Sequence, residues 1–296
     1  MKPLVIFNPV AGSVKKPNAV LSRLQRLDPV AVRVTRRRGD AERFAREAIQ
    51  EKCNYVVTAG GDGTLNAVIN GIAKLRPVEA VCVGIVPLGT GNDFARALGL
   101  PGTIDENIDV LRASKTRRID LVQVRSDRTR YFANVSSGGF SGVVDEKLTA
   151  KINRTWGPLA YVRSAAAALP KLHAYRTRLV FDEEEELSIE LYNVVIGNGR
   201  FVAGGLPIAP DADLRDGILD VVLIQKRSAP EMVLLAAEIL LGKHLSSNAV
   251  IFRRAKKIAV RSRPGMCFNV DGELIGNAPA VFQVVPRALN FVVNRR

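Results

Sequence analysis

The stretch that decides the fold is Tyr55-Val56-Val57-Thr58-Ala59-Gly60-Gly61-Asp62-Gly63-Thr64-Leu65-Asn66. Its first three residues are β-branched or aromatic and predict a buried strand. Beyond the glycines, apolar residues recur at helical spacing, at Leu65, Val68, Ile69, Ile72 and Leu75. A glycine-rich turn therefore joins a strand to a helix. Glycine lets the backbone approach a ligand closely, and the free N–H groups of a helix start favour an anion, usually a phosphate.

Asp62 is an unexpected residue in an anion-binding turn, because its carboxylate would repel the anion. A cation such as Mg²⁺ between the two charges would remove the conflict. The alternative is an ordinary strand–helix turn with an acidic cap, and the turn alone leaves both interpretations open.

Three further strands are each followed by a polar turn. Their sequences are Leu4-Val5-Ile6-Phe7 before Asn8-Pro9-Val10-Ala11-Gly12, Val30 to Val34 before Thr35 and three arginines, and Ala80 to Val86 before Gly89-Thr90-Gly91-Asn92-Asp93. After the arginines, Asp40 is expected to cap a helix. Four strand–turn–helix units predict a parallel sheet with helices on both faces. Because ligands bind at the carboxyl ends of such strands, the four turns should form one composite site.

The composition and net charge of the chain indicate which kinds of molecule it could bind. The chain has 296 residues, of which 47% are hydrophobic, so it can form one large domain or two of ordinary size. The formal net charge of +14 is dispersed and favours a phosphorylated ligand, an anionic bilayer or nucleic acid. Aromatic residues make up only 6% of the chain, and no aromatic RNA-binding pattern occurs, so nucleic acid is not expected.

Cellular location follows from what the sequence lacks. Cys53, Cys82 and Cys267 show no paired spacing, which is typical of a reducing compartment. The first residues enter a strand without a signal-peptide pattern. No apolar run reaches the roughly 20 residues that span a bilayer. We therefore expect a cytoplasmic protein.

After about residue 119 the pattern changes to short strand-like runs separated by turns, which predicts a mostly antiparallel second domain. Two helical insertions interrupt it, at about residues 144–172 and 229–241, and both are expected to be core helices rather than membrane contacts.

Two acidic motifs lie in this second part. In Asp211-Ala212-Asp213-Leu214-Arg215-Asp216-Gly217, carboxylates at alternate positions could hold a divalent cation, although a plain turn explains the spacing equally well. In Asp271-Gly272-Glu273, two carboxylates could serve as a base and its partner, and a hairpin turn is the alternative.

Taken together, five motifs resemble the diacylglycerol kinase catalytic family, most closely its soluble bacterial lipid-kinase branch. They are Asn8-Pro9 with Gly12, Gly60 to Thr64 with Asn66, Gly89-Thr90-Gly91-Asn92-Asp93-Phe94-Ala95, Asp216-Gly217, and Asp271-Gly272-Glu273. The Gly-Gly-Asp-Gly-Thr element is shared with NAD kinases and, more loosely, with phosphofructokinases. The Gly-Thr-Gly-Asn-Asp-Phe-Ala stretch is more particular to the lipid kinases.

The resemblance implies an α/β domain with a Rossmann-like or phosphofructokinase-like parallel sheet, followed by an antiparallel β-sandwich domain with helical insertions. We place the nucleotide-binding domain at residues 1–118, with residues 286–296 returning to it. The lipid-substrate domain is expected at residues 119–285.

The resemblance also implies roles for individual residues. ATP would be contacted by Asn8, Pro9, Val10, Ala11, Gly12, Thr35, Gly60, Gly61, Asp62, Gly63, Thr64, Leu65, Asn66, Thr90 and Asn92. A structural Mg²⁺ would be held by Asp213, Asp216 and Ile218, partly through backbone carbonyls. The catalytic base would be Asp271 or Glu273. Ala11 departs from the family, which often has serine there, and so removes one hydroxyl near the phosphates.

The predicted function is Mg²⁺-dependent transfer of the γ-phosphate of ATP to a hydroxyl of a lipid such as diacylglycerol, in phospholipid biosynthesis. Asp62, together with Asp93, would orient Mg²⁺ or its waters. The positive surface would hold the enzyme peripherally and reversibly on an anionic membrane. The alternatives are an NAD-kinase-like enzyme for a soluble hydroxyl compound and a nucleotide-binding regulatory protein without turnover. The acceptor lipid and a homodimer are left open.

Overall fold

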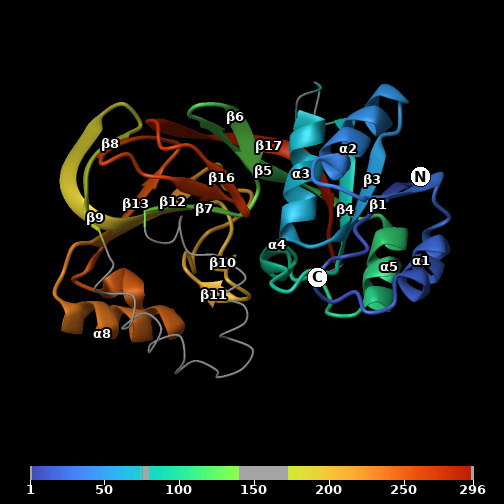
Figure 1. The fold of residues 1–296 in the computed structure, drawn as a ribbon, viewed down its shortest axis with the longest axis horizontal. Helices are drawn as coiled ribbons and strands as arrows, with labels where there is room; N and C mark the ends of the chain where they lie inside the picture. Colours follow the sequence, from blue (N-terminus) through green and yellow to red (C-terminus); the bar gives the residue numbers. More distant parts are fainter. Residues whose placement is uncertain (1, 74, 76–79, 140–172, 295–296) are drawn as a thin grey trace. The chain divides into compact units, whose positions relative to one another are not determined.

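Figure 1 shows the fold in a computed structural model, which describes residues 2–73, 75, 80–139 and 173–294. The chain divides into two compact units. The first contains the residues up to Leu121, Tyr131–Ala133 and the residues from Val285 onward; the second contains Val122–Arg130 and Asn134–Val284. The helical insertion expected at residues 144–172 lies outside the described residues.

A parallel sheet forms the centre of the first unit. Its strands run in the order β2-β1-β3-β4, and their bounds are Leu4–Phe7 for β1, Ala31–Val34 for β2, Tyr55–Gly60 for β3 and Cys82–Pro87 for β4. Beyond β4, Asn290 and Phe291 of the long strand β17 (Ala280–Val292) pair in parallel with Cys82 and Val83. The C-terminal segment therefore completes the sheet of the first unit.

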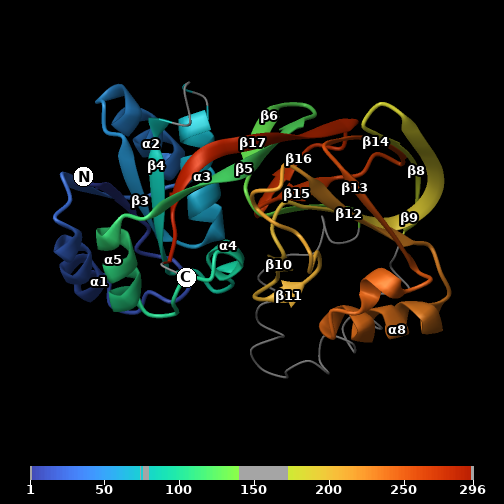
Figure 2. The same cartoon turned by 180° about the vertical axis from the view of Figure 1, so that it is seen from behind.

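Helices cover both faces of this sheet, with α2 and α3 on one side and α1 and α5 on the other (Figures 1 and 2). The helices are α1 (Pro17–Leu24), α2 (Asp40–Gln50), α3 (Asp62–Ala73), α4 (Asp93–Ala97) and α5 (Ile104–Ala113), with a 3₁₀ turn η1 (Gln25–Leu27). Leu24 and Ile108 pack with Val5 and Phe7 in one core cluster. Because both faces are covered, the strands are almost continuously apolar, as the sequence predicted.

Helices α2 and α3 pack closely against each other. A Cβ placed on Gly71 would lie 2.3 Å from the backbone oxygen of Glu42 and 2.9 Å from the Cβ of Ala45. The absence of a side chain at Gly71 therefore lets the two helices approach.

The second unit consists of antiparallel strands. They pair in the order β16-β15-β7-β9-β8-β14-β17, and β12 joins β9 to β13. The bounds are Val135–Gly139 for β7, Tyr175–Phe181 for β8, Glu185–Gly197 for β9, Leu219–Gln225 for β12, Val250–Ala255 for β13, Lys257–Arg263 for β14, Phe268–Val270 for β15 and Glu273–Ile275 for β16. This confirms the predicted change from a parallel α/β part to an antiparallel β-sandwich.

Shorter elements complete the second unit. Strand β5 (Thr116–Arg125) leads into it from the first unit and pairs with β6 (Thr129–Phe132) and β17. A separate two-stranded sheet joins β10 (Phe201–Val202) to β11 (Leu206–Pro207). A 3₁₀ turn, η4 (His244–Ser246), follows α8.

Helix α8 (Ala229–Leu240) begins with a capping box between Ser228 and Glu231. Its residues Leu235 and Ile239 pack in a core cluster with residues of β7, β9 and β12. This buried side agrees with the core helix predicted for residues 229–241, whereas Leu234 and Leu241 are 60% and 71% exposed. In the part of the chain that the structure describes, no helix is long and apolar enough to cross a membrane.

Candidate functional site

A cavity of about 370 Å³ lies in the first unit, where all four predicted turns follow their strands. Each turn contributes to its walls. The lining residues are Asn8, Ala11 and Gly12 after β1, Thr35, Arg37, Arg38, Gly39 and Ala41 after β2, Gly61, Gly63, Thr64 and Ala67 after β3, and Gly89 after β4. The carboxyl ends of parallel strands thus converge on one concave surface.

Hydrogen bonds hold the first turn against the third. The side-chain amide of Asn8 donates from Nδ2 to Oγ1 of Thr64 at 3.1 Å, and its Oδ1 accepts the N–H of Val10 at 3.1 Å. The backbone N–H of Asn8 donates to the carbonyl of Ala59 at 2.9 Å. Asn8 therefore fixes the position of the turn after β1 relative to the turn after β3.

Two glycines are required by close contact between turns. A Cβ on Gly61 would lie 2.8 Å from Cα of Gly89, and a Cβ on Gly89 would lie 2.6 Å from Cα of Gly61. Gly63 differs, because a Cβ there would meet no atom within 4 Å. Since Gly63 lines the cavity at the start of α3, its missing side chain leaves room for a ligand beside the free N–H groups of that helix.

Asp62 and Asn92 organise the fourth turn. Asp62 accepts the backbone N–H groups of Asp93 and Phe94, at 3.1 and 3.2 Å, and so caps α4. Asn92 adopts a left-handed conformation with φ of 52°, and its side chain exchanges hydrogen bonds of 2.8 and 2.9 Å with the backbone of Gly89. Both polar side chains therefore support the loop that carries Gly89.

The cavity lining includes seven of the predicted nucleotide contacts, namely Asn8, Ala11, Gly12, Thr35, Gly61, Gly63 and Thr64. The others lie behind or beside it. Leu65 and Asn66 are buried in α3 with 2% and 4% exposure, whereas Val10 is 86% exposed. Thr90 packs against Gly12, since a Cβ on that glycine would be 2.2 Å from Oγ1 of Thr90. Direct contact with the nucleotide stays a prediction for the residues that do not line the cavity, which are Pro9, Val10, Gly60, Asp62, Leu65, Asn66, Thr90 and Asn92.

Sequence reasoning missed several lining residues. The arginines after Thr35 were noted, but no role was assigned to them, and Arg37, Arg38 and Gly39 all line the cavity. Ala67 could have been found from helical spacing, because it lies one turn after Thr64 on α3. Ala41 and Gly89 carry no chemical signal of their own.

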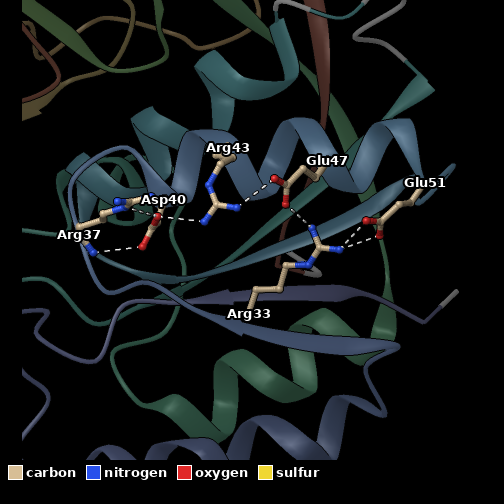
Figure 3. A network of polar contacts seen from close by, with 6 residues as sticks. All are labelled: Arg33, Arg37, Asp40, Arg43, Glu47 and Glu51. Atoms are coloured by element: carbon tan, nitrogen blue, oxygen red, sulfur yellow. Dashed lines mark hydrogen bonds and ion pairs between the residues drawn. The ribbon is translucent and has the colours of Figure 1, made fainter.

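The predicted capping role of Asp40 is wrong. Helix α2 begins at Asp40 itself, and Gly39, with φ of 91°, is its N-cap. The Asp40 side chain instead turns back to the preceding loop, where its Oδ2 accepts the backbone N–H groups of Arg36 and Arg37 at 2.9 and 3.1 Å. Arg43 donates to its Oδ1 at 3.1 Å, and the network continues through Glu47 to Arg33 (Figure 3).

These contacts predict a specific acid dependence of stability. Hydrogen bonds from the Arg36 backbone and the Arg43 side chain lower the pKa of Asp40 to about 2. Because the folded-state value is below the ordinary one, the carboxylate stabilises the fold above about pH 4, and this contribution disappears as pH falls toward about 2. Asp40→Asn should therefore lower the melting temperature at pH 6, and the difference from the unmodified chain should shrink at pH 2–3. A difference that is constant with pH would contradict this.

The acidic pair of the second unit is firmly held. Asp271, in a left-handed conformation with φ of 44°, accepts the N–H groups of Asn134 and Val135 at 3.2 and 3.0 Å. Oε1 of Glu273 lies 2.8 Å from Arg128 and 3.0 Å from Arg130. Asp271 and Gly272 form the two-residue turn of the β15–β16 hairpin, in which Val270 pairs with Glu273, so the hairpin alternative is confirmed and the role of a base stays a prediction.

The two aspartates predicted to hold a structural Mg²⁺ are paired with arginines. Both oxygens of Asp213 lie 3.0 Å from the guanidinium of Arg215. Asp216 accepts the N–H of Ile218 at 3.0 Å and forms an ion pair with Arg254. Within the described residues, no group of three or more His, Cys, Asp or Glu side chains is arranged to hold a metal ion. A cation at Asp213 and Asp216 would have to replace these two guanidiniums.

Comparison with known protein families covers nearly the whole chain. Residues 2–124 match the family model of the diacylglycerol kinase catalytic domain. Residues 133–293 match the model described as the YegS C-terminal NAD kinase beta sandwich-like domain. The boundary between the two matches falls where the antiparallel unit begins.

Two curated relatives are each named diacylglycerol kinase. A diacylglycerol kinase of Bacillus subtilis (strain 168) is 32% identical over 98% of this chain and 95% of the relative. A diacylglycerol kinase of Staphylococcus haemolyticus (strain JCSC1435) is 33% identical over 94% of this chain and 84% of the relative.

Solved structures share the fold. One protein from Bacillus anthracis str. Sterne aligns with a TM-score of 0.83 and 23% identity, over 99% of this chain and 95% of the other. The similarity spans both the parallel and the antiparallel unit. The two family models and the full-length relatives show that this chain belongs to the diacylglycerol kinase family.

Proposed function

We propose that this protein is a lipid kinase that transfers the γ-phosphate of ATP to a hydroxyl of a lipid such as diacylglycerol, with Mg²⁺ as the cofactor. The observation that carries the proposal is the cavity of about 370 Å³ with Gly63 open toward it. A helix N-terminus beside a glycine without steric neighbours suits a phosphate group. The curated relatives named diacylglycerol kinase support the choice of a lipid acceptor.

The nucleotide phosphates are proposed to bind at the start of α3. Gly61 and Gly63 would offer backbone N–H groups, as phosphate-binding turns do, whereas the N–H of Thr64 donates to the carbonyl of Gly61 at 3.0 Å. Ala11 offers no hydroxyl, so binding by the turn after β1 would use backbone groups. Phosphoryl transfer needs mainly positioning and charge neutralisation, which this rigid set of turns supplies.

Asp62 and Asp93 are the proposed ligands of the catalytic Mg²⁺ or of its waters. Each oxygen of Asp62 accepts one backbone N–H, which leaves a lone pair on each for a cation or a water. The donor set is carboxylate oxygen, which Mg²⁺ prefers. When bound, the ion would neutralise charge on the transferring phosphate. A structural Mg²⁺ at Asp213 and Asp216 is a separate proposal, in which the ion would displace the arginine partners of these two carboxylates.

The second unit is proposed to bind the acceptor lipid, with Asp271 or Glu273 as the base. A lipid alcohol has a pKa far above 7, so the base accepts its proton as the P–O bond forms instead of ionising it beforehand. The net charge of +14 supports reversible attachment to an anionic membrane surface from the cytoplasm.

One assay tests this function against its rivals. The purified chain is incubated with labelled ATP and Mg²⁺, and with vesicles containing diacylglycerol, with a total lipid extract, or with NAD in the absence of lipid. We expect label in a lipid product that depends on Mg²⁺. Label only in NADP would favour the NAD-kinase-like alternative, and binding of ATP without any labelled product would favour a regulatory protein.

A further inference from the structure

The loop between β2 and α2 forms one wall of the cavity, and its shape is imposed from both ends. The N–H of Thr35 donates to the carbonyl of Phe7 at 2.8 Å, which ties the start of the loop to β1. Gly39 ends the loop in a left-handed conformation. Arg37, Arg38 and Gly39 line the cavity between these two points.

Asp40 holds the middle of this loop. Its side chain is 6% exposed, and its Oδ2 accepts the N–H groups of both Arg36 and Arg37. Two backbone donors on one buried oxygen define the path of the chain into Arg38. The Asp40 carboxylate is itself held by Arg43 (Figure 3). Arg43 also packs over the ring of Phe44, 4.5 Å from its centroid.

The same network decides which arginines carry uncompensated charge. Arg33 is paired with Glu47 and Glu51 at 3.1 and 2.7 Å. Arg43 is paired with Asp40 and Glu47 at 3.1 and 3.0 Å. Arg37 keeps a looser contact of 3.6 Å with Asp40. Of the described residues, none forms a hydrogen bond or an ion pair with the side chain of Arg38, which nevertheless lines the cavity.

We propose that Arg38 binds the phosphate groups of the nucleotide and that Asp40 is the positioning residue that presents Arg38 to the cavity. The inference rests on the proposed function, because it takes ATP as the ligand of this cavity. A guanidinium with no carboxylate partner suits an oxyanion, with which it forms charge-assisted and often bidentate hydrogen bonds. The acidic network leaves Arg38 as the charge at this wall that an incoming phosphate can use.

The test of Arg38 measures binding of ATP, adenosine and inorganic tripolyphosphate to the full chain by calorimetry, at constant Mg²⁺. Arg38→Gln should weaken ATP and tripolyphosphate at least about tenfold, the scale of one charge-assisted hydrogen bond, and leave adenosine unchanged. Arg36→Gln is the matched control, because it removes the same charge from a residue two positions earlier in the same loop, which does not line the cavity. It should bind ATP almost normally.

The test of Asp40 compares two substitutions. Asp40→Ala removes the acceptor of both loop N–H groups and should weaken ATP about tenfold. Asp40→Asn keeps one oxygen that can accept both, so it should restore most of the affinity, although its Nδ2 no longer pairs with Arg43. Thermal unfolding of each variant verifies folding.

The outcomes separate this inference from the proposed function. If the unmodified chain does not bind ATP, both fail. If it binds ATP and Arg38→Gln binds equally well, or Arg36→Gln loses as much, the role of Arg38 is overturned. An equal loss of affinity for adenosine would show that Arg38 contacts the nucleoside instead of the phosphates. Equal losses in Asp40→Ala and Asp40→Asn would show that Asp40 acts through its charge and not by positioning the loop.

Discussion

If Glu273 is the base, Glu273→Gln should lower turnover by at least about a hundredfold while ATP binding is retained, because removing a general base costs that much or more. Glutamine has nearly the same shape but cannot take up the proton of the acceptor hydroxyl. The measurement is the rate of lipid phosphorylation at saturating ATP and lipid, together with the dissociation constant for ATP. Asp271→Asn should show a comparable loss if Asp271 is the base, and the two variants therefore identify which carboxylate acts.

The contacts of these residues require a control variant for Glu273 and a stability measurement for Asp271. Glu273 pairs with Arg128 and Arg130, so its loss could act through the ion pairs. Arg128→Gln removes one of those partners and keeps the carboxylate, and it should retain most of the turnover. Asp271→Asn also places an amide N–H against a backbone N–H of Asn134 or Val135, which should lower the free energy of unfolding by about 1–3 kcal/mol. Near-normal turnover in both acidic variants would remove the base assignment.

Gly63→Ala should weaken ATP binding by roughly 10–100-fold without harming the fold, since it would cost hydrogen bonds worth about 1.5–3 kcal/mol. The added methyl group meets no protein atom within 4 Å, so the chain can accommodate it. It occupies the space at the start of α3 that the proposal assigns to a phosphate. Because Gly63 lies inside a helix, alanine should even raise the free energy of unfolding by about 0.5–1 kcal/mol.

Gly102→Ala is the matched control for this substitution. A Cβ on Gly102 also meets no atom within 4 Å, and Gly102 does not line the cavity. Calorimetric titration with ATP and thermal unfolding are measured for both variants. A Gly63→Ala protein that is as stable as the unmodified chain and binds ATP with unchanged affinity would show that the phosphates do not lie beside the first turn of α3.

Much of the architecture could be predicted from local patterns. The apolar runs of β1, β3 and β4, each followed by a helical repeat, indicate parallel strands, and parallel strands must end at the same edge of their sheet. That geometry is why the turns after Phe7, Val34, Thr58 and Val86 could be assigned to one site before their positions were known. The antiparallel part was recognisable because its strands are short and separated by turns.

Local patterns could not show which polar groups meet across long stretches of chain. Asp62 was interpreted as a carboxylate that orients Mg²⁺ beside a phosphate, with an acidic cap of its own turn as the alternative. Its oxygens in fact accept the N–H groups of two α4 residues that follow it by 31 and 32 positions. Asp40 is a residue type that often caps helices, but the left-handed Gly39 is the N-cap of α2. The Asp40 carboxylate instead accepts the N–H groups of Arg36 and Arg37. Sequence spacing carries no information about such partners, because they depend on how the turns pack.

The sequence by itself therefore determined the two kinds of sheet, the edge of the first sheet at which a ligand would bind, and the family to which the chain belongs. Periodicity and the order of the glycine motifs are sufficient for these, because both are properties of neighbouring residues. Only the tertiary structure decided that Gly61 is required by contact with Gly89 whereas Gly63 faces open space. Only it showed that Arg38, alone in its run, lines the cavity without an acidic partner among the described residues, since ion pairing depends on distances that packing sets.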